Sequence, residues 1–285
     1  MATADADTLG SPDDLSDREQ DAVESLLFRL ADDEFVAAER YTYWQVRAPT
    51  LESDLALANI AQDEYGHARL WYDLLQDFGY TESELIFERE PERFRHATLV
   101  ELPFEEGNWA DAVVRTYLYD VAEDRRLEAL SESSYPRITD RIDKIVSEEE
   151  YHLDHAESWL ERLADDEDGQ KRLQSAVDRL FPHALTLFEP TEEEEAIVDL
   201  GLRTAPLDEL AEEWLERVVS RFDSLGLTTP VPADGAVTEE LLPDVRGRDG
   251  THTDYWPALR EEFTQTYREL GRTEATTIMQ DPDDE

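Results

Sequence analysis

Apolar residues recur along the chain at the spacing of α-helices, and acidic residues or histidine interrupt several of the apolar stripes. Between residues 57 and 71, one side of a 3.6-residue helix carries Leu57, Ile60, Glu64, His67 and Trp71. Burying a lone carboxylate costs on the order of several kcal/mol. We therefore expect Glu64 and His67 to share a partner in the interior, and a metal ion suits this pair of side chains.

A second stretch repeats this Glu-x-x-His arrangement. Glu149 and His152 lie on the apolar side of the helix predicted over residues 136–164, and each motif has an acid directly before its glutamate, Asp63 or Glu148. Outer carboxylates often accept hydrogen bonds from ligating imidazoles. We expect these two acids to play that part for the histidine of the opposite motif.

Each Glu-x-x-His helix follows an apolar helix that carries acids of its own. Glu34 lies on the first of these helices, and Asp120 and Glu123 lie one turn apart on the other. Two such helical hairpins are typical of a carboxylate-bridged di-metal site in a four-helix bundle. The predicted ligands are Glu34, Glu64, His67, Glu123, Glu149 and His152.

The predicted ligand set suits a di-iron centre. Its four carboxylates would balance the charge of two ferrous ions, and one imidazole per metal leaves positions open for dioxygen. Asp120 remains an alternative ligand. Buried ion pairs among the same residues are the competing interpretation, whereas His155 and His183 are expected to have packing or surface roles.

The same periodicity predicts an all-α fold, a four-helix bundle with additional C-terminal helices. Thr50 and Asn108 are predicted helix N-caps, and Gly79 is predicted to end a helix in the left-handed conformation. Helices are predicted over residues 17–47, 50–78, from 108 onward, 136–164, 169–187, 207–225 and 255–270.

The segments between these helices are predicted to be irregular. Residues 80–107 form a crossover, with a β-like fragment at 97–102, that would let the two hairpins pack as one bundle. Residues 191–205 and 228–250 are expected to be loops, and the acidic run 192–195 a solvated face.

We expect a single domain over residues 17–271. Residues 1–16 are acidic and rich in small side chains, and they are predicted to be disordered; residues 272–285 are predicted to be a mobile tail.

The net negative charge of the chain excludes some classes of binding partner. The chain has 26 basic and 71 acidic residues, a net charge of −45, which is typical of a protein adapted to high salt. Nucleic acid and anionic membranes carry charge of the same sign, so neither is expected to bind. The absence of cysteine excludes disulfides and thiolate metal sites, and without an apolar leader or membrane-length run the chain is predicted to be cytoplasmic.

Four segments resemble a known family. They are LESDLALANIAQDEYGHAR (51–69), NWADAVVRTYLYD (108–120), YHLDHAESWLERL (151–163) and GTHTDYWPAL (250–259). They are similar to the C subunits of phenylacetyl-coenzyme A epoxidases, which are bacterial-type multicomponent monooxygenases. The acidic composition suggests a haloarchaeal version.

This resemblance implies a ferritin-like component of a hetero-oligomer that epoxidises phenylacetyl-coenzyme A. The catalytic A subunit would be its partner, and a separate reductase subunit would deliver electrons from NAD(P)H. In that family the di-iron chemistry belongs to the A subunit, and well-known C subunits have lost the ligands. This sequence departs from that pattern because both Glu-x-x-His motifs and the acids at 34 and 123 are present.

Three hypotheses follow from this departure. The chain could support the A subunit while retaining a metal site, or it could itself be a di-iron oxygenase acting on another acyl-coenzyme A or apolar substrate. In the third, it is an interaction protein in which the six residues form buried ion pairs.

Overall fold

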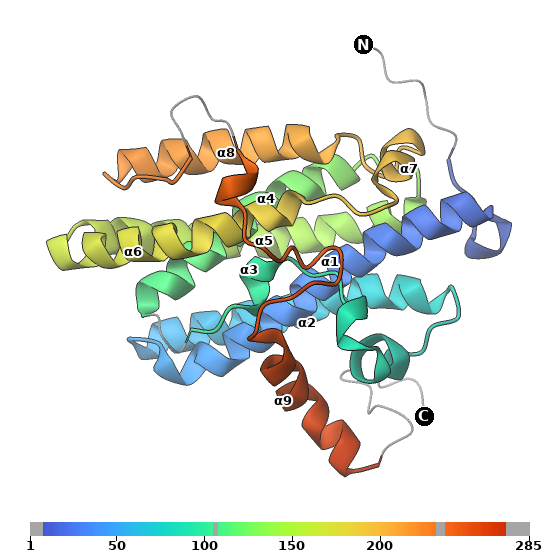
Figure 1. Ribbon diagram of the computed structural model, residues 1–285, viewed down its shortest axis with the longest axis horizontal. Coiled ribbons are helices and arrows are strands. Elements are labelled where there is room, and N and C mark those ends of the chain that lie inside the picture. Colours follow the sequence, from blue (N-terminus) through green and yellow to red (C-terminus); the bar gives the residue numbers. More distant parts are fainter. Residues whose placement is uncertain (1–7, 105–107, 232–236, 272–285) are drawn as a thin grey trace.

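Four long helices form the centre of the fold. The computed structural model describes residues 8–104, 108–231 and 237–271. Helices α1 (Asp17–Trp44) and α2 (Leu51–Gln76) form one hairpin, and α4 (Trp109–Leu130) and α5 (Pro136–Ala164) form the other (Figure 1). Within the described residues all regular elements are helical, which confirms the predicted all-α bundle.

The helix ends follow the predicted local chemistry. The Thr50 hydroxyl accepts a hydrogen bond from the Ser53 amide at 3.1 Å, and the Asn108 side chain accepts one from the Ala110 amide at 2.9 Å. Gly79, just beyond α2, has a φ of 95°, a left-handed conformation that glycine adopts without a Cβ penalty. The predicted caps at Thr50 and Asn108 and the predicted helix end at Gly79 are confirmed.

The remaining helices cover the bundle from two sides. Helices α6 (Glu167–Ala184) and α8 (Leu207–Ser224) pack against α4, where the Trp214 indole donates to the Leu118 carbonyl at 2.9 Å. Helix α9 (Trp256–Glu269) lies at the side of the first hairpin (Figure 1), and its Phe263 ring is 5.2 Å from that of Phe35. These helices give the bundle its C-terminal additions.

Several predicted boundaries need correction. Residues 8–16 are ordered, since Pro12–Asp14 form a 3-10 turn and the Leu9 amide donates to the Ser134 carbonyl at 2.8 Å; residues 1–7 and the tail 272–285 lie outside the described residues. The β-like fragment at 97–102 is the short helix α3 (Thr98–Glu101). Short helical turns span Pro12–Asp14, Gln45–Arg47, Glu84–Glu88, Pro91–Arg93, Leu185–Phe188 and Glu239–Leu241.

The acidic run 192–195 is not a uniformly solvated face. Helix α7 (Glu194–Asp199) begins within it, in a region predicted to be a loop. The Glu194 carboxylate pairs with Arg29 at 3.1 Å and with Arg203, and both arginines are buried. Both arginines lie outside residues 192–195, so the sequence of this acidic run could not predict that Glu194 forms ion pairs.

A buried aspartate on α1 ties distant segments to the bundle. Asp33 accepts hydrogen bonds from Arg126 at 2.6 Å, from the Ala97 amide at 2.7 Å and from two nitrogens of Arg248 at 3.0 and 2.7 Å. Burial would raise the pKa of the Asp33 carboxyl, but Arg248 and Arg126 hold it at about 2. The next residue on α1, Glu34, is also fully buried.

Candidate metal centre

The apolar stripes of the four long helices bring the predicted ligands together in the interior. Each stripe turns its interrupting acid or imidazole toward the other three helices, and every one of these side chains is buried. The buried residues are Glu34 from α1, Glu64 and His67 from α2, Asp120 and Glu123 from α4, and Glu149 and His152 from α5. We call these seven residues the bundle cluster.

The centre of the bundle cluster has metal-binding dimensions. Glu34, Glu64, His67 and Glu149 each offer one ligand atom, and these atoms all lie within 4.8 Å of one another. One oxygen of Glu149, Oε1, lies 3.3 Å from Nδ1 of His67 and 3.4 Å from Nδ1 of His152. The two imidazoles therefore face one carboxylate from opposite hairpins.

The outer nitrogens of both imidazoles contact acids across the bundle. His67 Nε2 lies 2.8 Å from Glu148 Oε2, and His152 Nε2 lies 3.3 Å from Asp63 Oδ2. Each of these carboxylates can accept a hydrogen bond from Nε2–H, so the Nδ1 atoms, which face Glu149, are the nitrogens that a metal ion could bind. These are the contacts expected from the sequence, while the metal-binding role of the cluster stays a prediction.

The two acids of α4 have different surroundings. Glu123 forms an ion pair with Arg126, which also binds Asp33. Neither carboxylate oxygen of Asp120 has a hydrogen-bond partner among the described residues. Both oxygens of Glu123 also lack a hydrogen-bond partner there, so the two acids differ in the ion pair that Glu123 forms with Arg126.

The bundle cluster concentrates negative charge in a region shielded from water. Burial, together with neighbouring carboxylates, raises the pKa of Glu64 and of Asp120 well above the ordinary range. Burial alone would also raise the pKa of Glu149, but His152 and His67 hold it at about 2. Burial would lower the pKa of His67, but Glu149, Glu34 and Glu148 raise it to about 9.

The buried donors of the bundle cluster fit a metal ion. Both oxygens of Glu34, Glu64 and Glu149 and the Nδ1 atoms of the two histidines lack a hydrogen-bond partner in the described parts of the chain. Orphaned buried polar atoms are costly and uncommon, and hard carboxylate oxygens with one imidazole per metal are the donors that iron accepts. The donor set therefore favours a metal centre over ion pairs alone.

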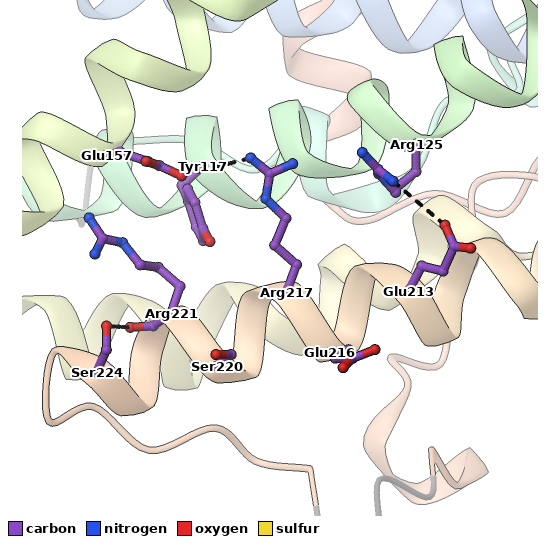
Figure 2. Close-up of a pocket in the computed structure, with 9 residues that line it drawn as sticks. All are labelled: Tyr117, Arg125, Glu157, Glu213, Glu216, Arg217, Ser220, Arg221 and Ser224. Atoms are coloured by element: carbon purple, nitrogen blue, oxygen red, sulfur yellow. Dashed lines mark hydrogen bonds and ion pairs between the residues drawn. The ribbon is translucent and has the colours of Figure 1, made fainter.

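A large surface cavity lies apart from this centre. It has a volume of about 530 Å³ and lies between α4, α5 and α8, where Figure 2 shows Arg217 directed toward Glu157 and Arg125 toward Glu213. None of its lining residues belongs to the bundle cluster. This cavity is therefore no route to the candidate centre.

The two remaining histidines of the sequence analysis lie outside the bundle cluster. His155 is half-buried beside Tyr151, and His183 Nδ1 lies 2.9 Å from the Thr98 hydroxyl. Sequence reasoning missed a further pair, His96 and His252, which together with Glu101 form a second group of ligand-type side chains. No local spacing could have revealed that group, because His252 is far from the other two members in the chain.

Comparison with known proteins identifies the family. Residues 7–274 match the family described as phenylacetic acid catabolic protein. The chain belongs to this family. Within it, the chain is 31% identical over 246 residues to the C subunit of the 1,2-phenylacetyl-CoA epoxidase of Escherichia coli (strain K12), covering 85% of this chain and 94% of that one.

A second relative in the family is the A subunit of the same epoxidase from Escherichia coli (strain K12). The chain is 27% identical to it over 194 residues, which cover 66% of this chain and 62% of the relative. The similarity to the C subunit is thus both higher and more extensive than that to the A subunit.

None of the helices in the described segments is long and apolar enough to cross a membrane.

Proposed function

We propose that this chain is a C-type component of a 1,2-phenylacetyl-CoA epoxidase that holds a di-iron centre of its own. The family match over residues 7–274 and the 31% identity to an epoxidase C subunit over 94% of its length support the role in the complex. The observation that carries the metal centre is the set of buried donors in the bundle cluster without hydrogen-bond partners.

In this proposal the six ligands are Glu34, Glu64, His67, Glu149, His152 and one acid of α4. Glu123 is the α4 ligand that the sequence predicts. Asp120 is the alternative, because Glu123 already forms an ion pair with Arg126. Asp63 and Glu148 would hold the imidazoles in the orientation that ligation requires.

A di-iron centre, when bound, supplies the activation of dioxygen for transfer of an oxygen atom. The chain's own residues exclude water from the site, since the side chains of the bundle cluster are almost completely buried. Asp63 and Glu148 keep the Nε2 protons of the histidines in place, so that each Nδ1 remains free to bind a metal.

Further parts of the proposal concern the setting of the complex. A catalytic A-type component is the proposed partner in a hetero-oligomer, and a reductase component is the proposed source of NAD(P)H-derived electrons. The net charge of −45 supports a haloarchaeal-type, halophilic protein that works in a high-salt cytoplasm.

The alternative function is catalysis by this chain itself, as an oxygenase acting on another acyl-coenzyme A or apolar substrate. That function needs a substrate cavity beside the centre. Two surface cavities, one lined by Tyr117 and Arg217 and the other by Tyr151 and Trp159, contain no residue of the bundle cluster. Neither of these two cavities supplies the substrate site that this function needs.

The double variant Glu64→Ala/Glu149→Ala separates the hypotheses when it is reconstituted with the A-type and reductase components. Loss of iron with intact epoxidation of phenylacetyl-CoA supports a C-type component with a non-catalytic centre. Loss of activity with intact assembly supports catalysis by this chain. Unchanged metal content removes both metal hypotheses. The double variant Glu52→Ala/Glu150→Ala is the matched control, because both of these acids are exposed on the same two helices.

A further inference from the structure

A second group of ligand-type side chains lies outside the four-helix bundle. His96 and Glu101 belong to the segment around α3, and His252 belongs to the segment before α9. Each offers one ligand atom, and these atoms lie within 4.8 Å of one another. His96 and Glu101 are fully buried, and the His252 side chain is only 5% exposed.

The three side chains converge on one carboxylate oxygen. His96 Nε2 lies 2.9 Å from Glu101 Oε2, and His252 Nδ1 lies 3.3 Å from the same oxygen. Two ligands of a tetrahedral zinc ion, with bonds of about 2.0 to 2.2 Å, are about 3.4 Å apart. The donors therefore stand close to the separation that such an ion imposes. The other oxygen of Glu101 accepts a hydrogen bond from the Thr253 amide at 2.7 Å, which fixes the carboxylate.

The imidazole of His252 points to a ligand. Neither of its ring nitrogens has a hydrogen-bond partner among the described residues, and the same holds for Nδ1 of His96. A buried imidazole normally has its polar atoms satisfied, because leaving one without a partner destabilises the fold. The nearest polar contact of His252 Nδ1 is Glu101 Oε2 at 3.3 Å, and an ion between these two atoms would bind both.

The backbone holds the two segments in place independently of any ion. Gly247 has a φ of 75°, and a Cβ at this position would lie 2.0 Å from the His96 carbonyl oxygen. Arg248 donates to the Arg95 carbonyl at 2.6 Å. These backbone contacts lie next to His96 and a few residues before His252. The fold therefore holds the two histidines near each other without an ion, which lowers the entropy lost when an ion binds.

We propose that His96, Glu101 and His252 bind one divalent transition-metal ion of the zinc type. The ion fastens the segment before α9 to the segment around α3, and a water molecule completes its coordination. Two imidazoles, one carboxylate and water are a donor set that zinc accepts. The Trp256 ring at the start of α9 lies 4.4 Å from the His96 ring, so the ion also secures the base of α9.

Cobalt titration of the metal-free full-length chain tests this proposal, because four-coordinate Co²⁺ absorbs visible light. The wild-type chain is expected to bind one more Co²⁺ than His252→Ala. At the second group, His252→Ala is expected to weaken Co²⁺ binding by at least about 100-fold, since loss of an outer hydrogen-bond partner alone costs about 10- to 100-fold. His155→Ala is the matched control and should keep the wild-type number of ions.

The test also distinguishes this ion from the proposed bundle centre. Glu64→Ala/Glu149→Ala should lose the metal of the bundle and keep the His252-dependent ion, so either proposal can fail alone. Glu101→Gln keeps the size and one acceptor oxygen of the side chain, and it provides a second variant if His252→Ala does not fold. Equal Co²⁺ numbers and equal spectra for wild type and Glu101→Gln would overturn the proposal.

Discussion

The substitution Arg248→Ala removes a buried ion pair that connects the C-terminal part of the chain to α1. Two guanidinium nitrogens of Arg248 bind Asp33 at 3.0 and 2.7 Å, and the same nitrogens donate to the carbonyls of Arg95 and Leu187 at 2.6 and 3.2 Å. The Arg248 side chain is 1% exposed. Alanine at this position would leave the Asp33 carboxylate buried with fewer partners.

The expected loss of stability follows from the partners that remain. Removing one member of a buried ion pair costs about 3 to 5 kcal/mol. Arg126 and the Ala97 amide still bind Asp33 in the variant, so we expect the lower value, about 3 kcal/mol. With roughly 2 to 4 °C per kcal/mol for a chain of this size, the melting temperature should fall by about 6 to 12 °C.

Thermal and urea unfolding in molar potassium chloride measure this loss. Salt at this concentration screens exposed pairs and leaves buried ones largely intact. Arg268→Ala is the matched control, because Arg268 pairs with Glu261 at 2.5 Å with both side chains exposed, and it should change stability by less than about 1 kcal/mol. If Arg248→Ala were as stable as Arg268→Ala, the ion pair would not hold the segments together.

Three further predictions concern single positions. Gly247→Ala should destabilise the fold by about 2 kcal/mol or more, because the residue has a positive φ and a Cβ there would clash with the His96 carbonyl oxygen. In contrast, Gly66→Ala should stabilise α2 by about 0.5 to 1 kcal/mol, because a Cβ at this position would have no heavy atom within 4 Å. Urea unfolding of both variants checks the contrast, and a destabilised Gly66→Ala would show that α2 has no room there. Burial lowers the pKa of His183 to about 4, whereas an unfolded imidazole titrates near 6.5. Stability should therefore decrease as pH falls from about 6.5 toward 4, and His183→Gln should lose this part of the acid sensitivity; identical pH profiles for the variant and wild type would contradict this assignment.

The long helices could be predicted because their signals are local. Apolar spacing at 3.6 residues defines the stripes, and Thr50 and Asn108 carry their capping chemistry in their own side chains. The inward position of Glu64 and Glu149 follows from the same spacing. These features can be predicted without knowing which helices pack against each other.

Features that depend on distant partners could not be predicted. The α3 segment has β-branched and apolar residues, yet tertiary contacts such as that of Thr98 with Thr186 hold it as a helical turn. Likewise, the charge of Glu194 is balanced by Arg29, which lies 165 positions away. Glu123 and Arg126 are only three residues apart on α4, so their ion pair is local. Arg126 also donates to Asp33 on α1, however, and that contact could not be predicted from the local sequence.

The central claim is tested most directly by the iron content of the chain, purified alone in high potassium chloride and reconstituted with ferrous iron. We predict about two irons per chain, with the absorption bands of an oxo-bridged di-iron centre after oxidation, and their loss in Glu64→Ala/Glu149→Ala. The exposed-acid control Glu52→Ala/Glu150→Ala should retain both irons. A wild-type chain that takes up no iron under these conditions would contradict the di-iron centre and leave a protein whose buried acids and histidines pair with one another.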